Sequence, residues 1–303
     1  MGEAQTEGRE VFLISNPNAG RGGARREREV ELFRARLASH GLRVEVASTQ
    51  GPRDASRLAR EASARGFREV IVSGGDGTIH EAVQGLVGAK ARVGIWPAGT
   101  SNVLARHLAL PFDAERAAQV FAEGRTRRIT LGRATDAKRG DARYFFLIAG
   151  VGLDASVVRH TRPRLKRRVG EAAYWYAGLG HLAHWQPRVF TVEVDGEEHR
   201  ATYAAVGKAP WYGGGLAVTP RARLDADHFE VCVINTQSRL RYLYLLTHAM
   251  RDGLKGDRKD VRFIKARSVR ISGESDVQAD GELIGRLPMT FELVPEGLEV
   301  VVP

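Results

Sequence analysis

The feature that most restricts the fold is a repeated alternation of apolar runs and amphipathic segments through the first part of the chain. Short apolar runs, each predicted to form a strand, lie at residues 11–15, 42–47, 69–73 and 92–96. Segments with helical spacing of apolar residues lie at 24–38, 55–62, 78–87 and 101–108, with a last helix expected at 113–122. Such alternation predicts a parallel sheet with flanking helices, in a Rossmann-like three-layer α/β domain.

The pattern changes after residue 128. Many short strand candidates follow, at 129–134, 143–149, 189–194, 201–207, 229–235, 269–272, 290–293 and 298–302. Asp195-Gly196 predicts a hairpin turn, and residues 172–183 and 240–250 predict helical interruptions. We therefore expect an α/β domain over 1–128 and a mainly antiparallel β-sandwich over 129–303, with a last strand that packs back on the first domain.

Composition limits the class of protein. The 303 residues are 43% hydrophobic, which supplies the cores of roughly two domains. The net charge of +10 favours an anionic partner such as nucleotide phosphate, acidic lipid or nucleic acid. Cys232 is the single cysteine, so an internal disulfide is excluded. No apolar run reaches the ~18 residues of a membrane span and residues 1–10 are polar, so we expect a cytoplasmic protein.

Three glycine-bearing loops follow predicted strands of the first domain. They are Asn16-Pro17-Asn18-Ala19-Gly20, Gly74-Gly75-Asp76-Gly77-Thr78 and Pro97-Ala98-Gly99-Thr100-Ser101-Asn102. In a parallel sheet all three lie at one edge, where helix N-termini present free N–H groups to phosphate. Glycine suits such loops because a Cβ atom would hold the backbone away from phosphate oxygens. The alternative for any one loop is a tight turn without a ligand.

Two other phosphate-binding patterns are disfavoured. The chain contains no Gly-x4-Gly-Lys-Ser/Thr sequence, which excludes a P-loop. Gly150-x-Gly152-x-x-Ala155 imitates a dinucleotide fingerprint, but basic residues follow where a helix and a second strand should lie.

The motifs, taken in order, resemble those of the diacylglycerol kinase catalytic domain family, which includes bacterial soluble lipid kinases and sphingosine kinases and is related to NAD kinase. The three loops above resemble its nucleotide-side motifs. Later segments resemble its second-domain motifs: Gly150 to Ala155, Tyr212-Gly213-Gly214-Gly215 with Pro220, and Asp280-Gly281-Glu282. The resemblance covers nearly the whole chain.

The resemblance implies a lipid kinase that uses ATP and Mg²⁺. It implies that the β-rich domain binds the lipid and brings the catalytic acid to a cleft beside the nucleotide. Glu282 would be the base that takes the proton of the lipid hydroxyl, with Asp280 as its neighbour or a metal contact. The implied nucleotide-binding residues are Asn16, Pro17, Asn18, Ala19, Gly20, Thr49, Gly74, Gly75, Asp76, Gly77, Thr78, Thr100 and Asn102.

The carboxylates allow more than one interpretation. Asp76, between glycines, is either a Mg²⁺ ligand or the organiser of a turn. Without the resemblance, Asp280-Gly281-Glu282 reads as a tight turn. The family's acidic Mg²⁺ motif in the second domain is usually Asp-Asp-Gly, whereas the matching segment here has Ala226 for the second acid and Asp227 for the glycine. Asp225 and Asp227 remain candidate metal ligands, against the alternative of a solvated loop.

A basic run with nearby aromatic residues suggests an anionic membrane surface as a partner. Arg159 and the run 162–168 precede Tyr174, Trp175, Tyr176 and Trp185. The alternative is a solvated charged face. No nucleic-acid-binding module accompanies the run, so nucleic acid is not an expected partner. His181 and His184 have no third ligand and are expected to be structural.

The expected function is thus phosphoryl transfer from ATP to a hydroxyl of diacylglycerol or a related lipid such as a sphingoid base or ceramide. The alternatives are a soluble-substrate kinase like NAD kinase and a non-catalytic protein that binds nucleotide or membrane. A homo-oligomer is left open, as is peripheral attachment to the inner face of the membrane.

Overall fold

The computed structural model describes residues 9–20, 22–160, 180–182, 184–256 and 259–303. Contacts divide the chain into two compact units. The first comprises residues up to Arg128 together with Leu298–Pro303, and the second comprises Ile129–Gly297. Each unit is described by itself below.

The first unit is built on a parallel sheet in the order β2-β1-β3-β4. Its strands are β1 (Glu10–Ser15), β2 (Arg43–Ser48), β3 (Glu69–Gly74) and β4 (Arg92–Pro97). Ser15 is paired with both Ser48 and Ser73, so the strands end level with one another. The C-terminal end of β16 (Met289–Val301) adds a further parallel strand, with Val300 opposite Val93.

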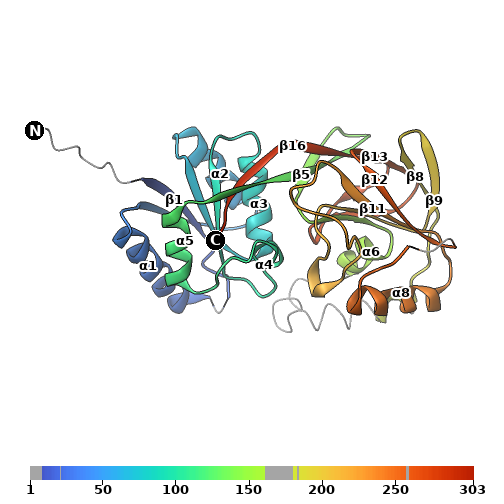
Figure 1. Ribbon diagram of the computed structural model, residues 1–303, viewed down its shortest axis with the longest axis horizontal. Helices are drawn as coiled ribbons and strands as arrows, with labels where there is room; N and C mark the ends of the chain where they lie inside the picture. The colour runs from blue at the N-terminus through green and yellow to red at the C-terminus, as the bar shows by residue number, and fades with distance from the viewer. Residues whose placement is uncertain (1–8, 21, 161–179, 183, 257–258) are drawn as a thin grey trace, which may run out of the picture. The chain divides into compact units, whose positions relative to one another are not determined.

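Helices cover the two faces of this sheet, as Figure 1 shows. They are α1 (Gly23–Ser39), α2 (Asp54–Ala64), α3 (Asp76–Leu86), α4 (Val103–His107) and α5 (Ala114–Glu123). Helix α1 packs beside α5, and Phe33 stacks on Trp96 with ring centroids 4.0 Å apart. Helix α2 packs beside α3. Because side chains alternate along a strand, each face of the sheet is buried under one helix pair.

The second unit is a β-sandwich. One sheet is antiparallel with the order β12-β11-β10-β7-β14-β15, formed by Val261–Ala266, Phe229–Ile234, Tyr203–Gly207, Ile148–Val151, Asp276–Ala279 and Glu282–Arg286. The facing strands are β5 (Thr126–Asp136), β6 (Ala142–Phe145), β8 (Phe190–Val194), β9 (Glu197–Ala201), β13 (Ser268–Ser272) and β16. The remaining elements are α6 (Leu153–His160), the short 3₁₀ turn η1 (Gly213–Gly215) and α8 (Arg239–Arg251).

Residues of both sheets meet in a single apolar core. Phe145, Phe229 and Phe291 are fully buried there, and Phe145 stacks on Phe229 at 5.8 Å. The Asp195-Gly196 turn joins β8 to β9 with both residues at positive φ, as predicted for a two-residue hairpin. The fold class predicted from the pattern, a parallel α/β domain followed by an antiparallel sandwich, is confirmed.

Several element boundaries differ from the prediction. The run 143–149 is divided into β6 and β7, because the Phe146 and Leu147 amides donate to the Asp280 carboxylate and not to a strand. The two candidates at 290–293 and 298–302 are one continuous strand, β16. Strand β12 was not predicted. A helix, α6, does follow β7, but β7 lies in an antiparallel sheet, so no dinucleotide-binding βαβ unit is formed there.

Within the described part of the chain, no helix has the length and apolar character needed to cross a membrane.

Candidate functional site

The three glycine-bearing loops of the first unit interlock at the carboxyl edge of its sheet. The Asn16 side-chain amide donates to the Thr78 hydroxyl at 2.9 Å, which ties the first loop to the second. The Asp76 carboxylate accepts a hydrogen bond of 2.7 Å from the Val103 amide, which ties the second loop to the third. The predicted gathering of the loops at one edge is therefore what the structure shows.

Glycine is required where the second and third loops touch. A Cβ atom on Gly99 would lie 2.5 Å from the Gly75 Cα atom, a distance that real Cβ atoms do not adopt. Gly20 has φ +62° and would place a Cβ 3.1 Å from the Ala98 carbonyl oxygen. The backbones therefore approach one another more closely than side chains allow.

Two helices begin at this edge of the sheet, where the sequence predicts that phosphate binds. Helix α3 begins at Asp76 and α4 at Val103, so first-turn N–H groups of both helices lie at this edge. Gly77 and Thr100 are exposed there, and the buried Thr49 donates its amide to the Ser15 carbonyl at 2.9 Å. These loops are the predicted place for the phosphates of ATP, the nucleotide that the family resemblance implies.

Asn102 has a shaping part in this arrangement. It adopts φ +46° and is 1% exposed. Its side chain closes on Gly99, accepting from the Gly99 amide at 2.9 Å and donating to the Gly99 carbonyl at 2.7 Å. Asn102 therefore fixes the shape of the third loop, and its place among the nucleotide-binding residues stays a prediction.

Asp76 makes the contact expected of a turn organiser, since one carboxylate oxygen holds the Val103 amide. Among the residues that the structure describes, no group of three or more His, Cys, Asp or Glu side chains is arranged to hold a metal ion. Kinases bind Mg²⁺ through one or two carboxylates and the nucleotide phosphates, and Asp76 fits that limited donor set. Its assignment as a Mg²⁺ ligand remains a prediction.

A pocket borders the first and third loops, and it contains a buried arginine that the sequence analysis missed. Ala19, Gly20, Trp96 and Ala98 line the pocket, together with Arg26. The Arg26 guanidinium lies 4.6 Å from the Trp96 ring centroid and donates to the Ser73 hydroxyl. Burial lowers the pKa of Arg26. The sequence signal is its spacing from Phe33 and Leu37, which places it on the buried stripe of α1.

In the second unit, the Asp280-Gly281 turn between β14 and β15 is held by its own carboxylate. Both oxygens of Asp280 accept backbone N–H groups, from Phe146 and Leu147 at 2.9 Å and from Ile148 at 3.1 Å. Asp280 has φ +48° and Gly281 +84°, a tight hairpin turn. We assign Asp280 a positioning part, because its oxygens fix the turn and this geometry does not support the predicted metal contact. The next residue, Glu282, begins β15 and is exposed.

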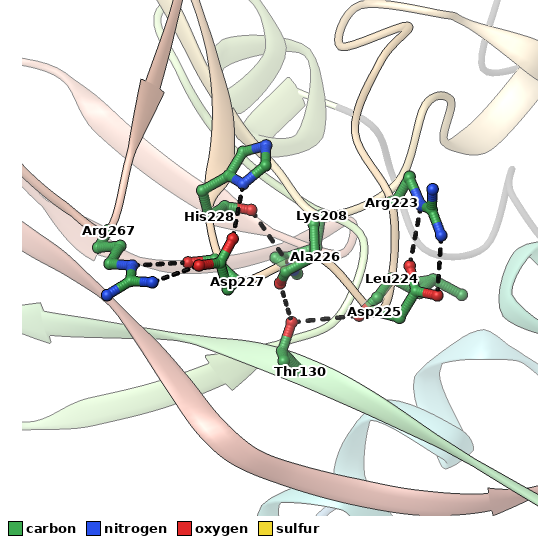
Figure 2. Close-up of polar contacts among 9 residues, drawn as sticks. All are labelled: Thr130, Lys208, Arg223, Leu224, Asp225, Ala226, Asp227, His228 and Arg267. Carbon is green, nitrogen blue, oxygen red and sulfur yellow. Dashed lines mark hydrogen bonds and ion pairs between the residues drawn. The ribbon is translucent and has the colours of Figure 1, made fainter.

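The carboxylates of Asp225 and Asp227 are each held by different cationic partners. Figure 2 shows them on opposite sides of their segment, each directed to its own cationic partner. Asp225 pairs with Arg223 at 3.0 Å, while Asp227 pairs with Arg267 and with His228 at 3.0 Å. Hydrogen bonds from His228 and Arg267 lower the pKa of Asp227 to about 2. The predicted second metal site does not fit these residues.

The second unit contains an apolar pocket with a buried acid at its wall. Helix α8 contributes Leu245 and Ala249, β10 contributes Tyr203, and α6 contributes Asp154. Burial raises the pKa of Asp154 to about 6, against hydrogen bonds from Tyr212 and Gln278 that lower it. The motif 150–155 was noted in the sequence without a part for Asp154. A lone acid inside an apolar motif is the signal that identifies it.

The fully buried Gln278 joins this pocket to the turn that carries Glu282. Its side-chain nitrogen donates to the Asp154 carboxylate at 2.6 Å, and its oxygen accepts the Gly281 amide at 2.8 Å. A single side chain therefore connects the acid of the pocket to the hairpin of the predicted base. Sequence patterns gave no indication of this link.

Most of the predicted basic and aromatic patch, including residues 162–168 and Tyr174, Trp175 and Tyr176, lies outside the described residues. Of its described members, Arg159 pairs with Asp276 at 2.5 Å. Trp185 is buried and packs edge-on against Tyr242 at 5.0 Å. His181 shares a 2.7 Å hydrogen bond with the Ser156 hydroxyl. Trp185 is therefore a core residue and not a surface anchor.

Replacing Gly99 with alanine tests the contact between the second and third loops. We expect Gly99→Ala to weaken ATP binding at least tenfold and to destabilise the protein by about 1–3 kcal/mol, because the added methyl group meets the Gly75 backbone. Gly51→Ala is the matched control, since a Cβ atom there meets nothing within 4 Å. Nucleotide titration and thermal unfolding measure both. Equal ATP affinity in the two variants would contradict the proposed contact.

The buried Asp154 predicts a pH dependence of stability. Because its folded-state pKa is raised to about 6, the folded protein binds this proton more tightly than the unfolded chain does. The free energy of unfolding therefore falls as the pH rises from about 4 through 6, by roughly 3 kcal/mol from this group.

Asp154→Asn should remove that component, and the difference between wild type and variant in denaturant unfolding across this pH range measures it. Asp195→Asn, in an exposed turn, is the control. Parallel pH profiles for wild type and Asp154→Asn would show that folding does not shift the pKa of Asp154.

Comparison with known proteins agrees with this geometry. Residues 10–134 match the model of the diacylglycerol kinase catalytic domain, and residues 148–302 match that of the YegS C-terminal NAD kinase beta sandwich-like domain. A diacylglycerol kinase of Mycobacterium tuberculosis is 32% identical over 298 residues, covering 97% of this chain and 95% of that protein. One from Staphylococcus carnosus is 29% identical over 304 residues, covering 96% and 94%.

The crystal structure of a diacylglycerol kinase from Bacillus anthracis shares the fold, with a TM-score of 0.75 at 21% identity, covering 99% of this chain and 98% of that one. The two family models take in the glycine loops, the buried Asp154 and the Asp280-Gly281 turn, so the resemblance inferred from the ordered motifs is confirmed. The chain belongs to the diacylglycerol kinase family.

Proposed function

We propose that this protein transfers the γ-phosphoryl group of ATP to the free hydroxyl of diacylglycerol, with Glu282 as the base. The observation that carries the proposal is the link inside the second unit between an apolar pocket and the Glu282 turn, made by Asp154, Gln278 and Gly281. A pocket walled by aliphatic and tyrosine side chains suits acyl chains. This lining favours a lipid over the polar substrate of an NAD-kinase-like enzyme.

The chemistry requires little covalent help from the protein. ATP supplies the phosphoryl group, and Mg²⁺, when bound, would neutralise the negative charge of the phosphates. The glycine loops and the N-terminus of α3 would hold the phosphates, and Asp76 would contribute a carboxylate oxygen to the metal. Glu282 takes the proton as the lipid oxygen bonds to the γ-phosphorus, and the bond from that phosphorus to the bridging oxygen breaks to release ADP. Asp280 and Gln278 keep the hairpin of Glu282 fixed.

Glu282→Gln should lower kcat by about 10²- to 10⁴-fold while ATP affinity stays within twofold, because the amide cannot take up the proton. The purified protein is incubated with labelled ATP and a panel containing diacylglycerol, a sphingoid base, ceramide and NAD. Glu274→Gln, an exposed acid of the same unit, is the control.

The panel also separates the alternatives. Phosphorylation of NAD alone would favour the soluble-substrate kinase. ATP binding without turnover on any acceptor would favour a non-catalytic protein. Full activity in Glu282→Gln would remove Glu282 from the mechanism.

We further propose that the protein reaches its substrate through the exposed face of α8. Leu240, Leu243, Tyr244 and Met250 of this helix are 80%, 40%, 50% and 50% exposed. Their spacing places them on one side of α8, while Tyr242, Leu245 and Ala249 on the other side line the apolar pocket. One helix therefore presents apolar side chains both to solvent and to the pocket, as expected at a membrane surface.

The double variant Leu240→Asp and Leu243→Asp should weaken sedimentation with anionic vesicles at least tenfold, because two apolar side chains no longer enter the bilayer. Turnover of a short-chain, water-soluble diacylglycerol should change little. Val189→Asp, on a residue of the second unit that is 38% exposed, is the control. Unchanged vesicle binding in the double variant would exclude α8 as the docking face.

A further inference from the structure

A buried lysine lies against the segment where the family's acidic metal motif would be. Lys208 follows the end of β10 and is 0% exposed. Its ammonium donates to the Ala226 carbonyl at 2.5 Å and lies 3.4 Å from the His228 carbonyl, which it also contacts (Figure 2). Two backbone oxygens of one short segment thus converge on a single positive charge.

Other cationic and donor groups complete the environment of this segment. Thr130 donates its hydroxyl to the Ala226 carbonyl at 2.8 Å and its amide to the Leu224 carbonyl at 2.8 Å. Arg223 and Arg267 hold the carboxylates of Asp225 and Asp227 away from each other. The backbone oxygens and both acids that a divalent ion would bind are therefore already occupied by protein donors.

Burial and nearby carboxylates act on the Lys208 ammonium in opposite directions. Burial lowers the pKa of this lysine to about 8, and attraction to Asp225 and Asp227 acts in the opposite direction. A buried ammonium with carbonyl acceptors and nearby carboxylates has the surroundings of a bound cation.

We propose that the Lys208 ammonium is the built-in cation of residues 224–228 and takes the place of the divalent ion that the family motif implies. The ammonium holds the Ala226 and His228 carbonyls together, and the two arginines neutralise the two acids. The segment lacks an acid at Ala226 and would bind a divalent ion less well, and the Lys208 ammonium of the same unit supplies the positive charge in its place. The second unit consequently needs no metal for its stability, whichever lipid the protein uses.

The first test compares nucleotide-free protein in Mg²⁺, in Mn²⁺ and in a chelator. We expect the melting temperatures in Mg²⁺, Mn²⁺ and chelator to agree within about 1 °C. A metal ion that stabilised the protein by about 1 kcal/mol or more would raise the melting temperature by more than this. We also expect Mn²⁺ titration by electron paramagnetic resonance to reveal no tight site that disappears in the Asp225→Asn, Asp227→Asn double variant. A stabilising metal site that is lost in this double variant would overturn the proposal.

The second test removes the lysine charge. Lys208→Met should lower the melting temperature by roughly 5–10 °C, since the carbonyls lose their cation. Lys265→Met, on an exposed lysine of β12, should change it by less than about 1 °C. Unchanged stability in Lys208→Met would contradict the proposal.

If Lys208→Met fails to fold, the double variant Lys208→Ala, Ala226→Asp provides a further measurement. It removes the ammonium and restores an acid, so its melting temperature should rise on addition of Mg²⁺ or Mn²⁺, in contrast to wild type. Indifference of a folded double variant to both ions would count against the proposal. None of these readouts depends on kinase activity, so their failure is distinguishable from failure of the proposed reaction.

Discussion

The parallel register of β1, β3 and β4 is the constraint on which the first unit's candidate site depends. Because Ser15 and Ser73 are paired, as are Ser73 and Trp96, the three loops that follow these strands leave the sheet at the same level. Only then can the Asn16 amide reach Thr78 and the Asp76 carboxylate reach the Val103 amide. Glycine is needed at position 99 because loops that leave the sheet so close together leave no room there for a side chain.

In the second unit, buried polar groups fix the position of the candidate site. Asp280 takes three backbone amides out of the strand pattern, which ends β6 and fixes the hairpin of Glu282. Gln278 is fully buried and satisfied at both ends, by Asp154 and by the Gly281 amide. Buried polar groups of this kind specify one arrangement, because any displacement leaves a donor or acceptor unpaired. The same rule governs Lys208 and its two carbonyls.

The carboxylates of the chain separate into classes by their surroundings. The carboxylates of Asp225 and Asp227 form ion pairs with arginines. The Asp280 carboxylate accepts hydrogen bonds from backbone amides. Asp154 is buried against apolar side chains, and this burial raises its pKa to about 6. Glu282 is exposed at the start of a strand whose turn is rigidly held. Residue type alone does not distinguish these cases, although each supports a different chemistry.

The sequence by itself determined the layered α/β unit, the sandwich, the three loops and the family, because alternating apolar patterns and glycine motifs are local signals. It also located the Asp280-Gly281 turn and the departure at Ala226. Tertiary structure decided which polar groups meet: the Gln278 side chain with Asp154, the Asp280 carboxylate with the Phe146 amide, and the Lys208 ammonium with the Ala226 carbonyl. Such contacts depend on strand order and register, which bring together residues up to more than a hundred positions apart and leave no periodic trace in the chain.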